Sequence, residues 1–289
     1  MTTPVVLDLD RSVGALPREL RLPLAEHQEA LRFGCSLRTL ARFAQLLDER
    51  LPAAHGTVLF GSGDFHHLSW PLIARVRGAA RFQVVVLDNH PDNMRYPFGV
   101  HCGSWVRRVA RLPQVSHVHV VGITSTDIDA RHAWENYRAP LRAGRLSYWS
   151  IGVETRWAAR AGIGDALHGF AHADALVEAF VAHLRATPQP AYLSIDKDVF
   201  DDAVAHTNWD QGRLYPHHAT AIVAALTAGL VGSDITGEVS MYRYRSRYKR
   251  WLAARDAQPP VDPDRLAHWQ TQQHALNAVL LAALDRCRA

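Results

Sequence analysis

The chain has 289 residues, 48% of them hydrophobic, and a formal net charge of +4. This length allows a large buried core, and so mild a charge does not by itself indicate a nucleic-acid-binding protein. The three cysteines, Cys35, Cys102 and Cys287, are far apart and show no Cys-x-x-Cys spacing, which argues against a disulfide framework or a structural zinc site. No apolar run approaches the ~20 residues needed to cross a bilayer, and no leader-like segment opens the chain. We therefore expect a soluble, cytoplasmic protein that does not bind a membrane.

Apolar strand patterns alternate along the chain with segments of helical periodicity. Strands are predicted at 4–10, 56–60, 117–123, 145–151 and 234–240, and at the apolar runs that begin at Phe82 and Ala191. Helices are predicted at 26–51, 72–76, 104–112, 174–186, 216–229 and 263–288. Such alternation implies a mainly parallel sheet that is covered by helices on both faces. The sequence predicts a single domain over residues 1–289, an α/β fold with three αβα layers.

The apolar run from Phe82 to Leu87 leads directly into Asp88-Asn89-His90-Pro91-Asp92. In an extended chain, alternate side chains point the same way, so Asp88, His90 and Asp92 could converge where the strand ends. Ligands of open α/β sheets bind just outside the carboxyl ends of the strands. The alternative interpretation is a polar loop that follows a core strand.

A second apolar run, from Ala191 to Ile195, leads into Asp196 and Asp198. Two carboxylates held close together resist joint ionisation, and a cation bound between them removes that penalty. Four carboxylates and one imidazole at two strand ends suit a divalent ion such as Mn²⁺ or Mg²⁺. The two stretches together therefore predict a metal site.

These motifs make the chain resemble the ureohydrolase family of arginase, agmatinase and formiminoglutamase. The family motifs Gly-Gly-Asp-His, Asp-Ala-His-x-Asp, Ser-Phe-Asp-x-Asp-x-x-Asp-Pro and a late Glu-Val have counterparts here in the same order. The counterparts are Gly63-Asp64-Phe65-His66, Asp88-Asn89-His90-Pro91-Asp92, Ser194-Ile195-Asp196-Lys197-Asp198-Val199-Phe200-Asp201-Asp202 and Gly237-Glu238-Val239. The resemblance implies an arginase-like fold and a binuclear manganese hydrolase. Such an enzyme would cleave a C–N bond of a small guanidino compound by attack of a metal-bridging hydroxide, releasing urea.

The resemblance also implies a role for each site residue. His66, Asp88, Asp92 and Asp196 would hold one Mn²⁺, and Asp88, His90, Asp196 and Asp198 the other. Asp92 would accept a proton during attack, His101 would act as a proton shuttle, and Glu238 would pair with the guanidinium. His67 competes with His66 as the ligand, because Gly-Asp-Phe-His-His departs from the family motif.

Departures from the family leave the substrate open. Asp202 stands where the family has proline, and residues 203–212 replace a Thr/Gly/Pro-rich loop. The substrate could instead be a formimino compound, a ureido compound or an arginine side chain on a peptide. Two other classes remain: an arginase-fold binding protein without turnover, and a zinc deacetylase on a related fold. The zinc enzyme would not need the Asp196/Asp198 pair.

Aromatic and basic residues alternate over 242–251, Tyr-Arg-Tyr-Arg-Ser-Arg-Tyr-Lys-Arg-Trp. Such a stretch can be a solvated basic loop, line the mouth of a site or form a subunit edge, where Tyr, Trp and Arg are enriched. It can also bind nucleic acid, the least favoured of these interpretations. We further expect the protein to form a homo-oligomer.

Overall fold

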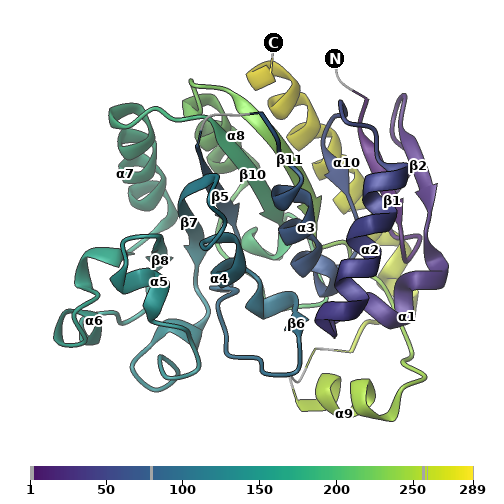
Figure 1. Cartoon of the computed structure of the whole chain (residues 1–289), viewed down its shortest axis with the longest axis horizontal. Helices are drawn as coiled ribbons and strands as arrows, with labels where there is room; N and C mark the ends of the chain where they lie inside the picture. The colour runs from purple at the N-terminus through teal and green to yellow at the C-terminus, as the bar shows by residue number, and fades with distance from the viewer. Residues whose placement is uncertain (1–2, 79–80, 256–257, 259, 289) are drawn as a thin grey trace.

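The structure is a computed structural model of the chain, and it describes residues 3–78, 81–255, 258 and 260–288. Its centre is a nine-stranded sheet in the order β2-β1-β4-β11-β10-β5-β7-β8-β9, in which all the neighbouring strands pair in parallel (Figure 1). Its strands are β1 (Val5–Asp8), β2 (Leu20–Pro23), β4 (Val58–Leu59), β5 (Phe82–Leu87), β7 (Val115–Ile123), β8 (Leu146–Ile151), β9 (Leu167–Phe170), β10 (Ala191–Asp196) and β11 (Leu230–Thr236). A separate antiparallel pair joins β3 (Gly34–Cys35) to β6 (Val100–His101).

The central strands are apolar on both sides because helices cover both faces of the sheet. Along β5, Val84 and Val86 belong to the core on one face, and Val85 and Leu87 to the core on the other. This is the alternation that a pleated strand imposes on its side chains. All six residues of β5 are buried, and so are all six of β10.

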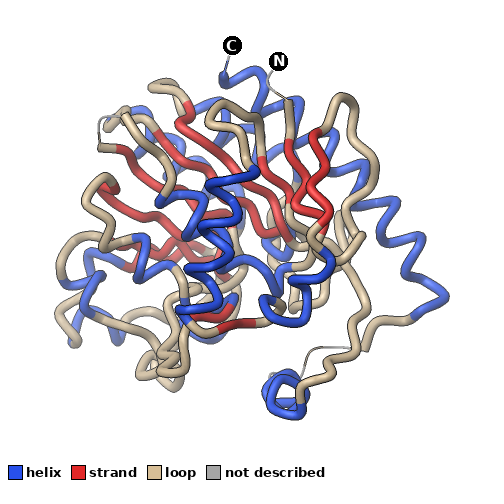
Figure 2. The backbone as a smooth tube through the Cα atoms, turned by 45° about the vertical axis from the view of Figure 1, so that its right-hand side comes forward, coloured by secondary structure: helices blue, strands red, loops and turns tan. Residues whose placement is uncertain are grey.

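The helices form two layers on opposite faces of the sheet (Figures 1 and 2). The first core contains residues of α2 (Leu37–Arg50), α3 (Ser69–Ala74) and α4 (Val106–Val109). The second contains residues of α7 (Ala173–Ala186), α8 (Pro216–Ala225) and α10 (Pro263–Arg288). The predicted three-layer αβα fold with a mainly parallel sheet is therefore confirmed. Among the described residues, none of the helices combines the length and apolar character that a bilayer crossing requires.

The helix predicted over 26–51 is interrupted. The chain forms α1 (Gln28–Leu31), then β3, and only then α2. Phe33 has a positive φ of 67°, a left-handed conformation that a helix cannot contain. The Ser36 hydroxyl accepts a hydrogen bond from the Thr39 amide at 3.1 Å, and this N-cap starts α2.

Other boundaries differ as well. The short strands β2 and β9 were not predicted, and both lie at edges of the sheet, where the apolar signal is weak. β11 ends at Thr236, because Gly237 takes a φ of +89°. The aromatic and basic stretch continues into a helix, α9 (Arg247–Arg255). α5 (Ala139–Arg142) and α6 (Trp157–Arg160) complete the α-helices of the described residues.

Candidate metal centre

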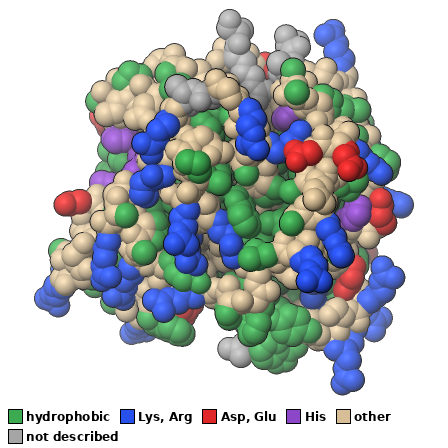
Figure 3. Space-filling model, viewed as in Figure 1, with side chains coloured by type: hydrophobic (Ala, Val, Ile, Leu, Met, Phe, Trp, Pro, Cys, Tyr) green, Lys and Arg blue, Asp and Glu red, His purple; other side chains and the backbone are tan. Residues whose placement is uncertain are grey.

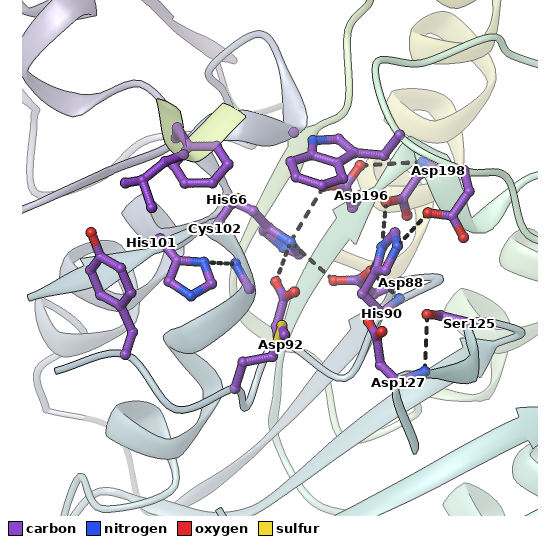
Figure 4. Close-up of a pocket in the computed structure, with 18 residues that line it drawn as sticks. His66, Asp88, His90, Asp92, His101, Cys102, Ser125, Asp127, Asp196 and Asp198 are labelled. Atoms are coloured by element: carbon purple, nitrogen blue, oxygen red, sulfur yellow. Dashed lines mark hydrogen bonds and ion pairs between the residues drawn. The ribbon is translucent and has the colours of Figure 1, made fainter. Parts of the chain in front are cut away.

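The two acidic stretches meet because β5 and β10 are neighbours in the sheet. Leu87 pairs with Ile195, so Asp88 and Asp196 follow side by side at the same edge. His66 arrives from η2 (Gly63–Leu68), the 3-10 helix that follows β4. Three separate parts of the chain thus contribute to one cluster (Figure 4).

The first group surrounds the imidazole of His66. Its Nδ1 lies 3.1 Å from Oδ2 of Asp88, 3.0 Å from Oδ2 of Asp92 and 3.4 Å from Oδ2 of Asp196 (Figure 4). The opposite nitrogen, Nε2, lies 2.9 Å from the hydroxyl of Ser194, which itself donates to Asp234 at 2.7 Å. Since that hydroxyl proton is committed to Asp234, Ser194 accepts from Nε2–H. In the neutral ring, Nδ1 therefore presents a lone pair to three carboxylates.

The second group surrounds His90. Its Nδ1 lies 3.0 Å from Oδ2 of Asp198 and 3.6 Å from Oδ1 of Asp88. Its Nε2 lies 2.8 Å from Oδ1 of Asp210. A carboxylate behind a histidine in this way fixes the ring and raises the basicity of the nitrogen on the other side. Asp88 belongs to both groups, the position that a shared ligand would occupy.

The charges of this cluster are unfavourable without a cation. Burial and the nearby Asp88 raise the pKa of Asp92 to about 7 and that of Asp198 to about 6. Burial and Asp198 likewise raise the pKa of Asp196. Burial opposes ionisation of Asp88 too, but the imidazoles of His66 and His90 beside it lower its pKa below the ordinary value.

Two buried atoms of the cluster have no hydrogen-bond partner within the described part of the chain, Nδ1 of His66 and Oδ2 of Asp88. An unpaired lone pair facing carboxylate oxygens is the arrangement that a divalent cation resolves. The donor set of oxygens with two imidazole nitrogens suits Mn²⁺ and contains no thiolate. The residues present therefore fit a pair of hard divalent ions.

The cluster forms the floor of a cavity of about 290 Å³. The side chains above it come from several separate segments of the chain and include His101, Ser125, Asp127, Asp210, Phe33, Met94, Tyr96, Cys102, Trp209 and Leu252. Trp209 covers His90 at a ring distance of 5.9 Å and stacks on Phe33 at 6.3 Å. No lysine or arginine is among the described residues that line this cavity.

His101 is in the cavity wall, as its proposed role requires. Its Nδ1 accepts a hydrogen bond from the amide of Gly103 at 3.0 Å, and its ring packs edge-on against Tyr96 at 4.5 Å. Burial lowers the pKa of His101 to about 4. Its imidazole is therefore neutral near pH 7.

The structure separates the two neighbouring histidines. His66 points into the acidic cluster, whereas Nε2 of His67 lies 4.0 Å from the sulfur of Cys35. His67 is fully buried but is not among the residues that line the cavity. The geometry thus favours His66 as the ligand.

Glu238 is not brought to the cavity. It lies beyond the end of β11, its carboxylate is buried, and its Oε1 lies 2.5 Å from Nζ of Lys197. The residue that faces Asp196 at this point is Gly237, where an added Cβ would lie 2.4 Å from Oδ1 of Asp196. The predicted contact between Glu238 and a guanidinium therefore has no support in this geometry.

Sequence reasoning missed several residues of the site. Asp127 and Asp210 bring further carboxylates to the cavity, and Asp234 orients His66 through Ser194. Asp210 and Trp209 lie in the segment 203–212, whose departure from the family pattern was the available signal. Asp127 lies in the short 3-10 helix η4 (Thr126–Ile128) after β7 and carried no recognisable motif.

The aromatic and basic stretch ends one residue before Leu252 of α9, which lines the cavity. Its start is held by Glu29, which accepts hydrogen bonds from the hydroxyl of Tyr242 and the amides of Arg245 and Ser246. Lys249 donates to the carbonyls of Glu29, Ala30 and Arg32, where α1 ends. This geometry agrees with the interpretation of the stretch as part of the mouth of the site.

An exposed hydrophobic cluster adjoins the same helix, at the lower edge of the molecule in Figure 3. Phe98, Tyr248 and Trp251 are 68%, 46% and 53% exposed. Phe98 packs edge-on against Tyr248 at 6.3 Å, and Tyr248 stacks on Trp251 at 6.2 Å. Tyr96 of the cavity wall also contacts Phe98, at 5.7 Å, so this aromatic rim is continuous with the cavity.

No protein-family model matches the chain. An uncharacterized protein of Thermotoga maritima is 24% identical to it over 240 residues, which cover 82% of this chain and 71% of that protein. The structure is similar to the proclavaminate amidino hydrolase from Streptomyces clavuligerus, with 17% identity, a TM-score of 0.53 and coverage of 99% and 93% of the two chains. It is also similar to the formimidoylglutamase from Bacillus subtilis, with 12% identity, a TM-score of 0.52 and coverage of 98% of this chain and 88% of that chain. For the arginase from Bacillus caldovelox the identity is 14%, the TM-score is 0.52 and 98% of each chain is covered. At these identities the likeness concerns the fold, and this chain has the arginase-like fold that its motifs predicted.

Proposed function

We propose that the protein is a two-metal hydrolase that cleaves a C–N bond of a guanidino compound and releases urea. The observation that carries the proposal is the convergence of six side chains around two groups that share Asp88. They are His66, Asp88, His90, Asp92, Asp196 and Asp198. Manganese is the proposed ion, because carboxylate oxygens dominate the donor set and imidazole nitrogens complete it.

The ligands divide between the two groups. His66 and Asp92 would hold one ion, and His90 and Asp198 the other, with Asp88 and Asp196 as the proposed shared ligands. Bound there, two divalent ions supply an activated water near neutral pH and polarise the bond that is cleaved. They also neutralise the four clustered acids.

The protein's own groups would manage the protons. Asp92 lies among the residues that line the cavity, and its carboxylate would accept the proton that the attacking water loses. The indole of Trp105 donates to Oδ2 of Asp92 at 2.5 Å and holds the carboxylate in place. His101, neutral at this pH, can relay a proton toward the departing amine without retaining it.

The charge of the cavity supports a cationic substrate. Asp127 and Asp210 add carboxylates to the wall, and the described lining contains no basic side chain to pair with an anionic group. No hydrogen bond or ion pair of the Asp127 carboxylate is found within the described residues. Aromatic rings such as Trp209 and Tyr96 also favour a delocalised cation over an anion. A guanidino compound with a cationic or neutral far end therefore fits this cavity better than one with a free carboxylate.

The test is an assay of urea, formamide and ammonia release with added Mn²⁺. The panel should contain matched four-carbon guanidines that end in an amine, a methyl group or a carboxylate, together with arginine, an arginine peptide, a formimino compound and a ureido compound. We expect urea from a guanidine, dependent on Mn²⁺ and absent with Asp88→Asn. Formamide in place of urea would instead indicate a formimino substrate, because departure of the substrate amine leaves the formimino carbon as formamide. No release from any compound by a protein that holds two Mn²⁺ would contradict the proposal.

A further inference from the structure

A lysine separates the two acids on the turn after β10. Asp196 and Asp198 line the cavity, whereas Lys197 lies between them in η6 (Lys197–Val199) and is fully buried away from it. A buried ammonium needs a counter-charge and hydrogen-bond acceptors, because its desolvation is otherwise strongly unfavourable.

Glu238 supplies the counter-charge of Lys197, and Glu238 and Asn277 supply the acceptors. The three side chains contact one another in a triangle. Nζ of Lys197 lies 2.5 Å from Oε1 of Glu238 and donates to Oδ1 of Asn277 at 3.2 Å. Asn277 in turn donates to Oε1 of Glu238 at 2.7 Å. None of the three side chains is more than 1% exposed.

The backbone around Glu238 is fixed to the same turn and to α10. An added Cβ on Gly237 would lie 2.5 Å from the amide nitrogen of Lys197, so only glycine allows this approach. Gln273 of α10 donates to the carbonyl of Gly237 at 2.8 Å and accepts from the amide of Val239 at 2.7 Å. The loop, the turn and α10 therefore form one packed unit behind the acids.

We propose that Glu238 is a positioning residue that acts through Lys197 to keep Asp196 and Asp198 directed into the cavity. This inference rests on the proposed two-metal site. It assigns Glu238 to the support of the metal ligands, where the motif had predicted a contact with the guanidinium.

The neighbouring charges explain why the pair matters. Besides Glu238, the carboxylates that attract Lys197 belong to Asp196 and Asp10. Without the charge of Glu238, the buried ammonium is drawn toward Asp196. It then competes with the metal for one of the proposed shared ligands.

The experiment measures Mn²⁺ affinity of the metal-depleted protein by calorimetry for the wild type, Glu238→Gln, and Lys197→Met/Glu238→Gln. Loss of a side chain that supports a ligand typically weakens metal binding by about 10- to 100-fold. We expect a loss of this size for Glu238→Gln. In the double variant, which contains no unpaired buried cation, affinity should return to within about threefold of wild type, because replacing both charges of a buried pair is often tolerated.

Leu184→Ala in α7 is the control for general destabilisation. Leu184 is buried in the core on the same face of the sheet, so its truncation should lower the melting temperature while leaving Mn²⁺ affinity unchanged. If Glu238→Gln does not fold, Asn277→Ala, which keeps both charges, should weaken Mn²⁺ binding in the same direction.

Unchanged Mn²⁺ affinity in Glu238→Gln, with loss of kcat/KM only on cationic substrates, would overturn the inference and restore the substrate contact. The proposed function would then stand. A wild-type protein that binds no Mn²⁺ would contradict both the inference about Glu238 and the proposed function.

Discussion

Nδ1 of His66 lies 3.1 Å from Oδ2 of Asp88, and neither atom has a hydrogen-bond partner in the described part of the chain. Ser194 accepts from the opposite ring nitrogen, so the neutral imidazole directs its lone pair at this carboxylate. Two electron-rich atoms held at this distance in a dry environment repel each other unless the imidazole is protonated or a cation lies beside them. The relationship identifies Asp88 and His66 as residues on which metal binding should depend.

Asp88→Asn and Asp196→Asn should each abolish Mn²⁺ binding and hydrolysis together. Asp88 belongs to both groups and Asp196 is the second proposed shared ligand, and a neutral amide is a poorer ligand for a hard cation than a carboxylate. Metal content by elemental analysis, followed by the urea assay, provides the measurement. Variants that keep two ions and near wild-type turnover would contradict the assignment.

His66→Ala should lower the occupancy of one ion selectively, because its Nδ1 faces Asp92 as well as Asp88. His67→Ala is the matched control one residue away. It should leave metal content near normal, since His67 lies beside Cys35. It should still lower the melting temperature through the cavity it leaves. The reverse pattern of metal loss would make His67 the ligand.

Asp210→Asn should weaken binding of the ion held by His90 by about 10- to 100-fold, because it removes the carboxylate that orients the ring. The wild-type distance between Oδ1 of Asp210 and Nε2 of His90 is 2.8 Å. Asp202→Asn is the matched control, because Asp202 pairs with His206 in the same segment, away from the cluster. Equal effects of the two variants on Mn²⁺ affinity would show that the loop acts only through its overall stability.

The stabilisation that Mn²⁺ confers should increase as the pH rises from 5.5 to 7.5. The folded-state pKa values of Asp92 and Asp198, about 7 and about 6, lie above those of the unfolded chain. In the metal-free protein, the stability contributed by these protonated groups is therefore lost as the pH rises through those values. Metal binding must displace the same protons, so it becomes stronger over the same range. Melting temperatures with and without Mn²⁺ at each pH measure the difference, and a pH-independent difference would contradict the proton coupling.

Asp127→Asn should raise KM for the amine-ended guanidine several-fold and leave KM for its methyl-ended counterpart unchanged. The carboxylate of Asp127 lines the cavity, and it can form a charge-assisted hydrogen bond only with the first compound. Steady-state kinetics on the two compounds decide the question. Similar changes in the KM values of the two compounds would show that Asp127 affects the shape of the cavity and does not bind the charged end of the substrate.

The elements that could be predicted from the sequence are those with a strong hydrophobic pattern over a short stretch of chain. The buried runs of β5 and β10, each followed by acids, predicted a sheet edge with converging carboxylates, and the structure brings these residues together. The edge strand β9 was missed, because its four residues include Gly169 and only one of them is buried. The ligand roles themselves stay predictions.

The orientation of Glu238 could not be obtained from its motif. Gly237 and Glu238 are adjacent, so a difference of one residue in where β11 ends decides which of them faces Asp196. That choice depends on Lys197 and Asn277, which contact Glu238 from distant parts of the sequence. Asp127 and Asp210 were missed for a related reason, since only the folded chain brings their loops to the cavity.

The pairing of β5 with β10 also has a consequence for the order of folding. The amide of Asn89 donates to Asp198 across a separation of 109 residues, and neither strand end alone contains a complete set of ligands. Two parallel strands that are far apart in the sequence can pair only after a large loop of chain has closed. This loss of entropy precedes the stabilising contacts, so the pairing is slow. Helices and local turns can therefore form well before the acids meet. In a refolding experiment, high-affinity capture of Mn²⁺ should lag behind the recovery of helical circular dichroism.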